Sequence, residues 1–197
     1  MNERLVRPGS LRMTQKIYTM TTRKKIIAIS GSTRQNSTNQ NLINAIIELY
    51  HEELDIQTFN GLSEVPHFNP DLDTENPPVT VSDFRRQLNE SNGILICTPE
   101  YAMGVPGTLK NAIDWMVSSM EFSHKPVALI TASSAGQKAH LSLLETLKII
   151  EADIPESSQL LISFVKTKVA DNKITDAATL QQVKNVIDSL KFMIDKK

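Results

Sequence analysis

A chain of 197 residues with 40% hydrophobic residues is long enough for one domain with a sizeable core, and a net charge of −1 argues against a general nucleic-acid binder. The single cysteine, Cys97, excludes an internal disulfide, and no run approaches the roughly 20 apolar residues of a membrane span. We therefore expect a cytoplasmic protein with neither a membrane span nor a nucleic acid partner.

The first 25 residues are strongly basic, with seven Lys or Arg residues against one acid, Glu3. They contain no apolar stretch of the length that a secretory signal needs. We predict that residues 1–23 form a basic, disordered or dispensable extension and that residues 24–197 form the domain. A transit peptide is the alternative for residues 1–23, because such peptides are basic and poor in acids.

Apolar runs of strand length alternate with helical patterns along the rest of the chain. Strands are predicted at 25–31, 55–59, 93–98, 126–132 and 159–165. Helices are predicted at 39–53, 81–89, 107–119, 138–151 and 176–196, and a long proline-containing loop at 60–79. This alternation indicates an α/β fold with a doubly wound parallel sheet. Ligands of such sheets bind beyond the carboxyl ends of the strands, which points to the loops at 31–39, 99–106 and 133–137.

The loop at 31–39 reads Gly-Ser-Thr-Arg-Gln-Asn-Ser-Thr-Asn and leads directly into a predicted helix. Its hydroxyl and amide side chains and Arg34 would surround a helix N-terminus, which is a natural site for an anion. The loop lacks the lysine of an ATP-binding Walker loop and has only one of the three glycines of a dinucleotide-binding turn. The pattern favours the phosphate of a small molecule, and simple helix capping is the alternative.

The loop after the third predicted strand is stiffened by Pro99 and Pro106 and loosened by Gly104 and Gly107. A rigid loop of this kind suits a flat heterocycle, although a well-made turn before a helix would explain Pro106 and Gly107. The loop at 133–137 is rich in small residues and would let a ring approach its backbone, but ordinary connecting loops share that composition.

Together these motifs resemble the NADPH-dependent FMN reductase family, flavodoxin-like enzymes that include quinone, azo-dye and chromate reductases. The family pattern Gly-Ser-x-Arg-x-x-Ser-x-Asn is filled by Gly31, Ser32, Arg34, Ser37 and Asn39. The second pattern, Pro-Glu-Tyr-Asn-x-x-x-Pro-Gly-x-Leu-Lys-Asn-Ala-x-Asp-Trp, is matched from Pro99 to Trp115 except that Ala102 replaces the asparagine. The similarity runs from about residue 24 to 164. It implies a flavodoxin-like three-layer fold with strand order 2-1-3-4-5.

The resemblance also implies how FMN would be held. The residues it assigns to the phosphate are Ser32, Arg34, Ser37 and Asn39, and Thr38 in the same loop is a further predicted cofactor-binding residue. Those it assigns to the isoalloxazine ring are Pro99, Glu100, Tyr101, Ala102, Met103 and Gly104, with Ser133, Ser134 and Gly136 bordering the flavin. The family often has a second glycine where this chain has Gln137, so Ala102 and Gln137 are the two departures that bear on flavin tuning and nicotinamide access.

As an activity, the resemblance implies that NADPH or NADH passes a hydride to N5 of FMN. The reduced enzyme would then pass electrons to a quinone, an azo compound, free flavin or a metal oxyanion by a ping-pong mechanism. No catalytic side chain and no metal are needed for this chemistry. The alternatives are a flavodoxin-like electron carrier reduced by a protein partner, and a regulatory flavoprotein without useful turnover.

Members of the family are commonly oligomers, so the resemblance implies a homodimer or homotetramer. The residues proposed for the subunit interface are Trp115, Met116, Val117, Met120 and Phe122. Cys97 falls inside a predicted strand and is interpreted as a core residue. The four histidines lack the spacing of metal ligands and are interpreted as surface or loop residues, with His140 lying near a loop of the predicted flavin site.

Overall fold

The computed structural model describes residues 23–197, so the predicted extension lies outside the described residues except for Arg23. Its centre is a parallel sheet of five strands in the order β2-β1-β3-β4-β5, as predicted. The strands are β1 (Lys24–Ser30), β2 (Leu54–Thr58), β3 (Gly93–Thr98), β4 (Val127–Ala132) and β5 (Gln159–Ile162). In the register of the sheet, Ile26 of β1 lies between Ile56 of β2 and Gly93 of β3.

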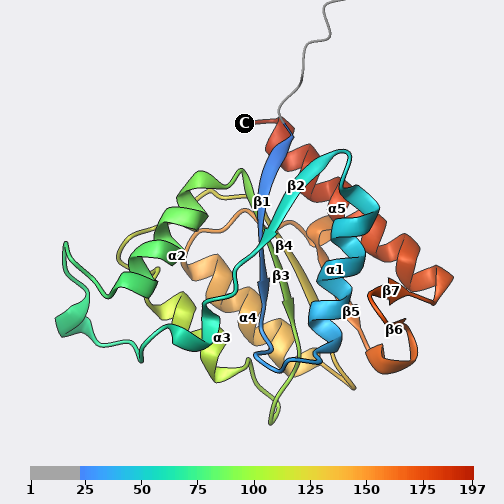
Figure 1. Ribbon diagram of the computed structural model, residues 1–197, viewed down its shortest axis with the longest axis horizontal. Coiled ribbons are helices and arrows are strands. Elements are labelled where there is room, and N and C mark those ends of the chain that lie inside the picture. The colour runs from blue at the N-terminus through green and yellow to red at the C-terminus, as the bar shows by residue number, and fades with distance from the viewer. Residues whose placement is uncertain (1–22) are drawn as a thin grey trace, which may run out of the picture.

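Helices cover both faces of this sheet and make it the middle of three layers (Figure 1). The helices are α1 (Thr38–Tyr50), α2 (Val79–Glu90), α3 (Gly107–Asp114), α4 (Gln137–Ile149) and α5 (Ala177–Asp195). Residues of α1 and α5 share one hydrophobic cluster with the sheet, and residues of α2, α3 and α4 share the other. Because both faces are covered, every residue of β3 and β4 is buried, which explains their unbroken apolar sequences.

Two predicted boundaries are wrong, and one element was missed. The third helix ends at Asp114 instead of continuing to residue 119, and β5 ends at Ile162 instead of residue 165. A short antiparallel hairpin of β6 (Val169–Ala170) and β7 (Lys173–Ile174) was not predicted. Asp171 and Asn172 form its turn with positive φ angles, which is the backbone of a two-residue hairpin loop that favours Asn and Asp.

The long loop after β2 is held in place by two side chains from the end of α3. Asn111 accepts a hydrogen bond from the backbone N–H of Phe68 (2.8 Å) and donates to the carbonyl of Pro66 (2.9 Å). The indole N–H of Trp115 donates to the same carbonyl (2.9 Å), and its ring meets Phe68 edge-on. The second motif therefore also serves the fold, by fastening a segment that has little regular structure of its own.

Three of the five residues expected to form a subunit interface cannot do so. Trp115, Met116 and Phe122 are fully buried in the core of the monomer, because they pack under the loop after β2 and against the sheet. Val117 and Met120 are 55% and 56% exposed and remain available to another molecule.

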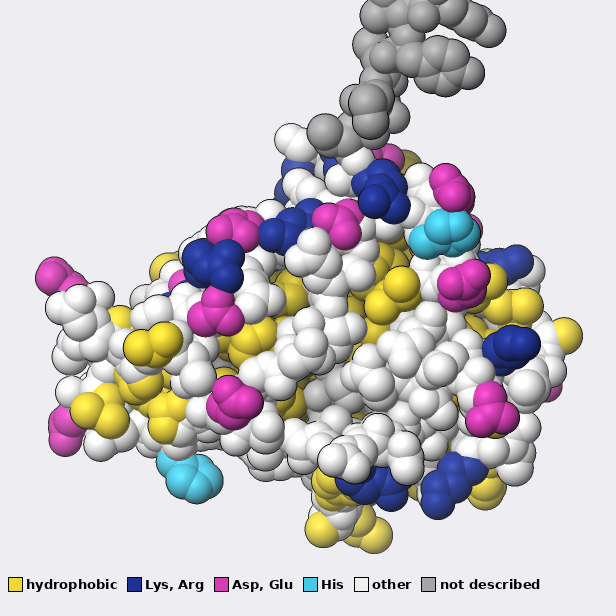
Figure 2. Space-filling view, viewed as in Figure 1, with side chains coloured by type: hydrophobic (Ala, Val, Ile, Leu, Met, Phe, Trp, Pro, Cys, Tyr) yellow, Lys and Arg dark blue, Asp and Glu magenta, His cyan; other side chains and the backbone are white. Residues whose placement is uncertain are grey.

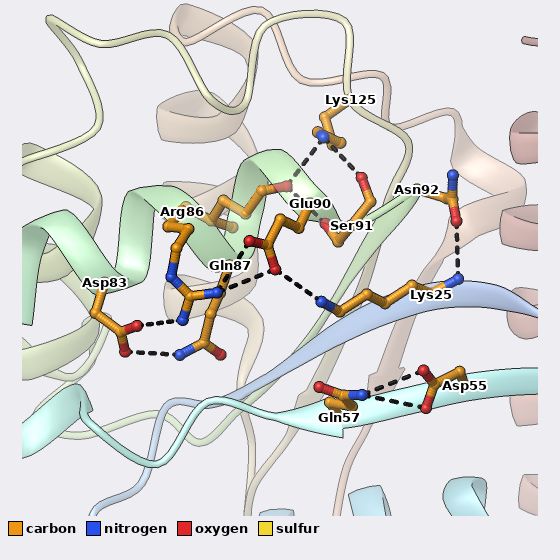
Figure 3. A network of polar contacts seen from close by, with 11 residues as sticks. Lys25, Asp55, Gln57, Asp83, Arg86, Gln87, Glu90, Ser91, Asn92 and Lys125 are labelled. Atoms are coloured by element: carbon orange, nitrogen blue, oxygen red, sulfur yellow. Dashed lines mark hydrogen bonds and ion pairs between the residues drawn. The ribbon is translucent and has the colours of Figure 1, made fainter.

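The amino-terminal edge of the sheet carries a network of charged groups (Figure 3). Lys25 pairs with Glu90, which also pairs with Arg86. Lys125 donates to the carbonyls of Leu88 and Ser91 (3.0 and 2.8 Å), at a helix end whose carbonyls need partners and where a positive charge is favourable. Burial lowers the pKa of Lys125. These charged groups therefore stabilise the fold at this edge of the sheet.

Within residues 23–197, every helix is too short or too polar to span a membrane.

Candidate functional site

A cavity of about 400 Å³ lies at the opposite, carboxyl-terminal edge of the sheet. Its size is within the usual range of ligand pockets. It brings together the three predicted loops and a fourth segment that follows β5. The residues lining it are Ser32, Arg34, Ser37, Thr38, Asn39, Pro99, Glu100, Tyr101, Ala132, Ser133, Ser134, Phe164, Val165, Lys166 and Thr167.

The first loop leaves β1 at Gly31, where the chain passes close to the next strand. A Cβ atom on this residue would lie 2.2 Å from Oγ1 of Thr98, so the position requires glycine. Helix α1 then begins with Ser37 as its N-cap residue, yet the Ser37 hydroxyl accepts no hydrogen bond from the described first turn, which also contains no acidic residue. The amides and partial positive charge of this helix end therefore remain available to an anion, and capping does not account for Ser37.

Arg34 projects from the same loop as an exposed side chain. One guanidinium nitrogen donates to the carbonyl of Asn36 (3.2 Å), and Arg34 forms no ion pair with any of residues 23–197. Its charge lies in the wall of the cavity beside the start of α1. Among the lining residues in the described part of the chain, Lys166 is the only other basic one.

Asn39 links the start of α1 to the end of β4. Its amide nitrogen donates to the carbonyl of Ala132 (3.1 Å), and the residue is 3% exposed. Its amide oxygen has no hydrogen-bond partner within residues 23–197. A buried acceptor without a donor costs about 1–3 kcal/mol, so a ligand that brings a hydroxyl or N–H group to this wall would be stabilised.

The second loop folds into a tight hairpin at its tip. Tyr101 and Gly104 exchange two backbone hydrogen bonds (3.0 and 2.9 Å). Ala102 and Met103 between them have φ angles of 47° and 61°, the left-handed backbone of a two-residue hairpin turn that favours Asn and Gly. The family's asparagine therefore suits the backbone of position 102, and Ala102 carries a conformational cost in addition to any lost contact.

Hydrogen bonds join the loops to one another. The hydroxyls of Tyr101 and Ser32 lie 3.1 Å apart, and the backbone N–H of Glu100 donates to the hydroxyl of Ser133 (3.2 Å). Ala102, Met103 and Gly104 form the projecting tip and are not among the described lining residues. Met103 is 74% exposed there, and Figure 2 shows hydrophobic side chains on the projection at the bottom of the molecule.

The third loop turns at Gly136, which is not among the described lining residues of the cavity. It has a φ of 102°, and a Cβ atom would lie 2.7 Å from Cδ1 of Leu161. The loop reaches the cavity through Ser133 and Ser134. Of the residues predicted from sequence, those of the first loop, the beginning of the second and these two serines are brought together.

The fourth segment, residues 164–167, was missed by the sequence analysis. Backbone N–H groups of Phe164 and Val165 donate to the carbonyls of Ser134 and Ser133 (3.2 and 3.1 Å), which fixes the segment beside the third loop. Phe164 is 69% exposed and has a φ of 53°, a strained conformation for an aromatic residue. The sequence did offer one signal, because the carboxyl end of β5 lies at the same edge of the sheet as the other three loops. The strand was predicted to run through residue 165, so residues 164 and 165 were not recognised as part of a loop.

Two further groups were singled out in the sequence. Cys97 is fully buried in β3 and burial raises the pKa of its thiol, so it is a core residue. His140 is half-buried on α4, where its Nδ1 lies 2.9 Å from the hydroxyl of Thr131 and burial lowers its pKa. Among residues 23–197, no group of three or more His, Cys, Asp or Glu side chains is placed to hold a metal ion.

Curated relatives match nearly the whole described chain. A quinone reductase of Escherichia coli K12 is 25% identical over 172 residues, covering 83% of this chain and 92% of that protein. An NAD(P)H-dependent FMN reductase of Pseudomonas aeruginosa is 29% identical over 177 residues, covering 86% and 95%. Among solved structures, the flavoenzyme FerB of Paracoccus denitrificans, an NAD(P)H:acceptor oxidoreductase, superposes with a TM-score of 0.72 at 25% identity, covering 88% of this chain and 98% of FerB.

The family model described as NADPH-dependent FMN reductase matches residues 24–167. This range begins at the first residue of β1 and ends at the last lining residue of the cavity, so it includes all four segments of the site. The chain belongs to the NADPH-dependent FMN reductase family, whose members are oxidoreductases that use FMN and NAD(P)H.

Proposed function

We propose that the cavity holds FMN and that the enzyme uses it to pass electrons from NADPH or NADH to small acceptors, quinones first among them. The observation that carries the proposal is the start of α1, where the helix end and Arg34 face the cavity and find no partner for their charge among residues 23–197. The family model supports FMN and a nicotinamide cofactor. The acceptor class follows relatives named as quinone reductases in Escherichia coli and Pseudomonas putida.

The described residues fit FMN at both ends of its polar chain. The free amides of α1, the hydroxyl of Ser37 and the guanidinium of Arg34 are donors, and a phosphate dianion offers only acceptors. The amide oxygen of Asn39 is the reverse case, a buried acceptor that needs a donor. A phosphate cannot supply one, but the ribityl hydroxyls of FMN can.

We assign roles along the cavity on this basis. The residues proposed to hold the phosphate are Ser32, Arg34, Ser37 and Thr38, and Asn39 is proposed to serve the ribityl chain as well. The residues proposed to border the isoalloxazine ring are Pro99, Glu100, Tyr101, Ser133 and Ser134, with Ala102, Met103 and Gly104 at the rim and Gly136 shaping the turn behind. The newly found Val165 and Thr167 would complete the wall.

When bound, FMN supplies the redox chemistry, because its ring accepts a hydride from NAD(P)H and returns electrons to an acceptor. The protein's part is to bind and orient. Tyr101 and Phe164 line the cavity with exposed side chains, and Met103 is exposed on the neighbouring loop tip. We propose that these side chains offer apolar surface to a nicotinamide or a quinone ring. One mouth for both substrates requires them to bind in turn, so we propose ping-pong kinetics. Azo compounds, free flavin and metal oxyanions are further candidate acceptors.

Initial rates of the FMN-loaded enzyme test this mechanism, with NADPH varied at several fixed concentrations of 1,4-benzoquinone. Ping-pong turnover gives parallel lines in double-reciprocal plots. Intersecting lines would mean that both substrates occupy the enzyme together and would contradict a shared mouth. Repeating the series with NADH and with an azo dye ranks the donors and acceptors.

We also propose that the chain forms a homo-oligomer through the apolar surface beside the loop after β2. Phe68, Leu72 and Val79 are exposed along that segment, with Val117 and Met120 exposed after α3. The two stretches are joined by a hydrogen bond between Ser118 and Asp73 (2.6 Å), and Figure 2 shows hydrophobic side chains gathered at this end of the molecule. Sedimentation of the wild type and of Val117→Glu tests it, since a charge in the interface should favour the monomer.

A further inference from the structure

Helix α4 begins in a way that prevents it from capping itself. Its N-cap residue is Gly136, which has no side chain to accept a hydrogen bond. A Ser or Asp cannot take its place, because φ is 102° and a Cβ would lie 2.7 Å from Leu161. The first turn also contains no acidic residue to favour the positive end of the helix dipole. The third amide of the helix, that of Ala139, is the one that an N-cap side chain normally serves.

The missing cap comes from the neighbouring loop. Oε2 of Glu100 accepts a hydrogen bond from the backbone N–H of Ala139 (2.9 Å). The same residue is tied a second time to the segment after β4, because its own N–H donates to the hydroxyl of Ser133 (3.2 Å). Glu100 therefore holds the loop after β3 against both the loop after β4 and the helix that follows.

We propose that Glu100 is a positioning residue that caps α4 from the adjacent strand and thereby fixes the two loops that border the isoalloxazine ring. This inference rests on the proposed function, which places FMN in the cavity, and it replaces direct contact between the Glu100 carboxylate and the flavin as the role of this residue. Both segments that Glu100 joins contribute lining residues, Pro99 on one side and Ser133 and Ser134 on the other.

The cap also explains how an acid is tolerated in the wall of a site for an anionic cofactor. A free carboxylate would repel FMN, whereas one hydrogen-bonded at a helix N-terminus has its charge offset by the helix. The loop needs such an anchor, because the backbone at its tip is costly. Ala102 and Met103 have left-handed conformations there, which are unfavourable for residues with a Cβ atom.

Loss of the cap should lower the fraction of apoprotein in the binding-competent arrangement, and the apparent Kd rises in inverse proportion to that fraction. A lost N-cap typically changes an equilibrium by roughly fivefold and at most by about 30-fold, which bounds the increase in Kd for FMN that we expect for Glu100→Ala. Glu100→Gln keeps an oxygen acceptor for Ala139 and should recover most of the affinity.

The test combines amide hydrogen exchange of the apoprotein with FMN titration followed by flavin fluorescence. Asp176→Ala is the matched control, because Asp176 caps the distant helix α5 through the N–H of Thr179 (2.8 Å). We expect Glu100→Ala to speed exchange in the first turn of α4 and to weaken FMN binding, Glu100→Gln to restore both, and Asp176→Ala to affect α5 with no change in Kd.

Unchanged exchange at the start of α4 in Glu100→Ala would overturn the cap. Faster exchange with an unaltered Kd would overturn the positioning role. A Glu100→Gln variant that keeps slow exchange at the start of α4 but binds FMN as weakly as Glu100→Ala would also overturn it, because the carboxylate would then act on the cofactor directly. FMN binding by the wild type tests the proposed function, and exchange is measured without cofactor. The inference and the proposed function can therefore fail separately.

Discussion

Replacing Arg34 with methionine should weaken FMN binding and leave the fold intact. The side chain is exposed, and the protein bond we find for it is a local one to the carbonyl of Asn36. The variant removes the positive charge and keeps most of the aliphatic stem. Surface substitutions of this kind usually change stability by less than about 0.5 kcal/mol, so the unfolding midpoint of the apoprotein should not move.

The expected loss follows from the charge-assisted hydrogen bonds that Arg34 is proposed to make with the phosphate. Hydrogen bonds to charged groups contribute about 1.5–3 kcal/mol, and 1.4 kcal/mol is a tenfold change in affinity. The Kd for FMN should therefore rise roughly 10- to 150-fold. Because the site is open to solvent at Arg34, the difference between wild type and variant should shrink as salt is added.

Riboflavin provides the control, since it has the same ring and ribityl chain without the phosphate. Titration of both ligands by fluorescence should show that Arg34→Met weakens FMN binding and leaves riboflavin binding unchanged. Equal losses for the two ligands would refute the phosphate role. Arg85→Met is the matched arginine variant, because the Arg85 side chain is 14% exposed and pairs with Asp73 (2.8 Å), so its loss should instead destabilise the fold, by about 1–3 kcal/mol.

Three further predictions concern the backbone, the long loop and pH. Ala102→Gly relieves a left-handed conformation and should raise the free energy of unfolding, measured with urea, by about 0.5–1 kcal/mol. Trp115→Phe removes the donor to the Pro66 carbonyl, so it should cost about 1 kcal/mol and speed proteolysis of the loop after β2. Burial lowers the pKa of His140 in the folded protein below its ordinary value of 6.5. At acidic pH this side chain therefore binds a proton more readily in the unfolded chain than in the folded one. Stability should fall as pH drops from 7 to 5, and it should fall less in His140→Gln.

The sheet could be predicted from sequence because its strands are buried on both faces. Their apolar runs are therefore unbroken, as in Gly93–Thr98 and Val127–Ala132. The hairpin of β6 and β7 has only two residues in each strand, too few to show a period, and Asp171 and Asn172 were its one signal. The end of α3 was missed because Trp115 and Met116 continue the apolar pattern although the helix has stopped at Asp114.

The site could be predicted as far as motifs and strand ends reach. Polar residues clustered after β1 pointed to the cavity wall before any geometry was known, and Ser32, Arg34 and Asn39 line it. The role of Glu100 could not be predicted, because the link to Ala139 joins positions 39 residues apart. The place of Phe164 in the site was missed for a different reason. Its apolar neighbours extend the pattern of β5, so it was predicted to belong to that strand.

The visible spectrum of the FMN-loaded enzyme under NADPH, without oxygen, tests the central claim most directly. The account predicts that the oxidised-flavin bands bleach when NADPH is added and return when a quinone follows. Bands that persist with both NADPH and NADH would contradict the reductase and favour a carrier that receives its electrons from a protein.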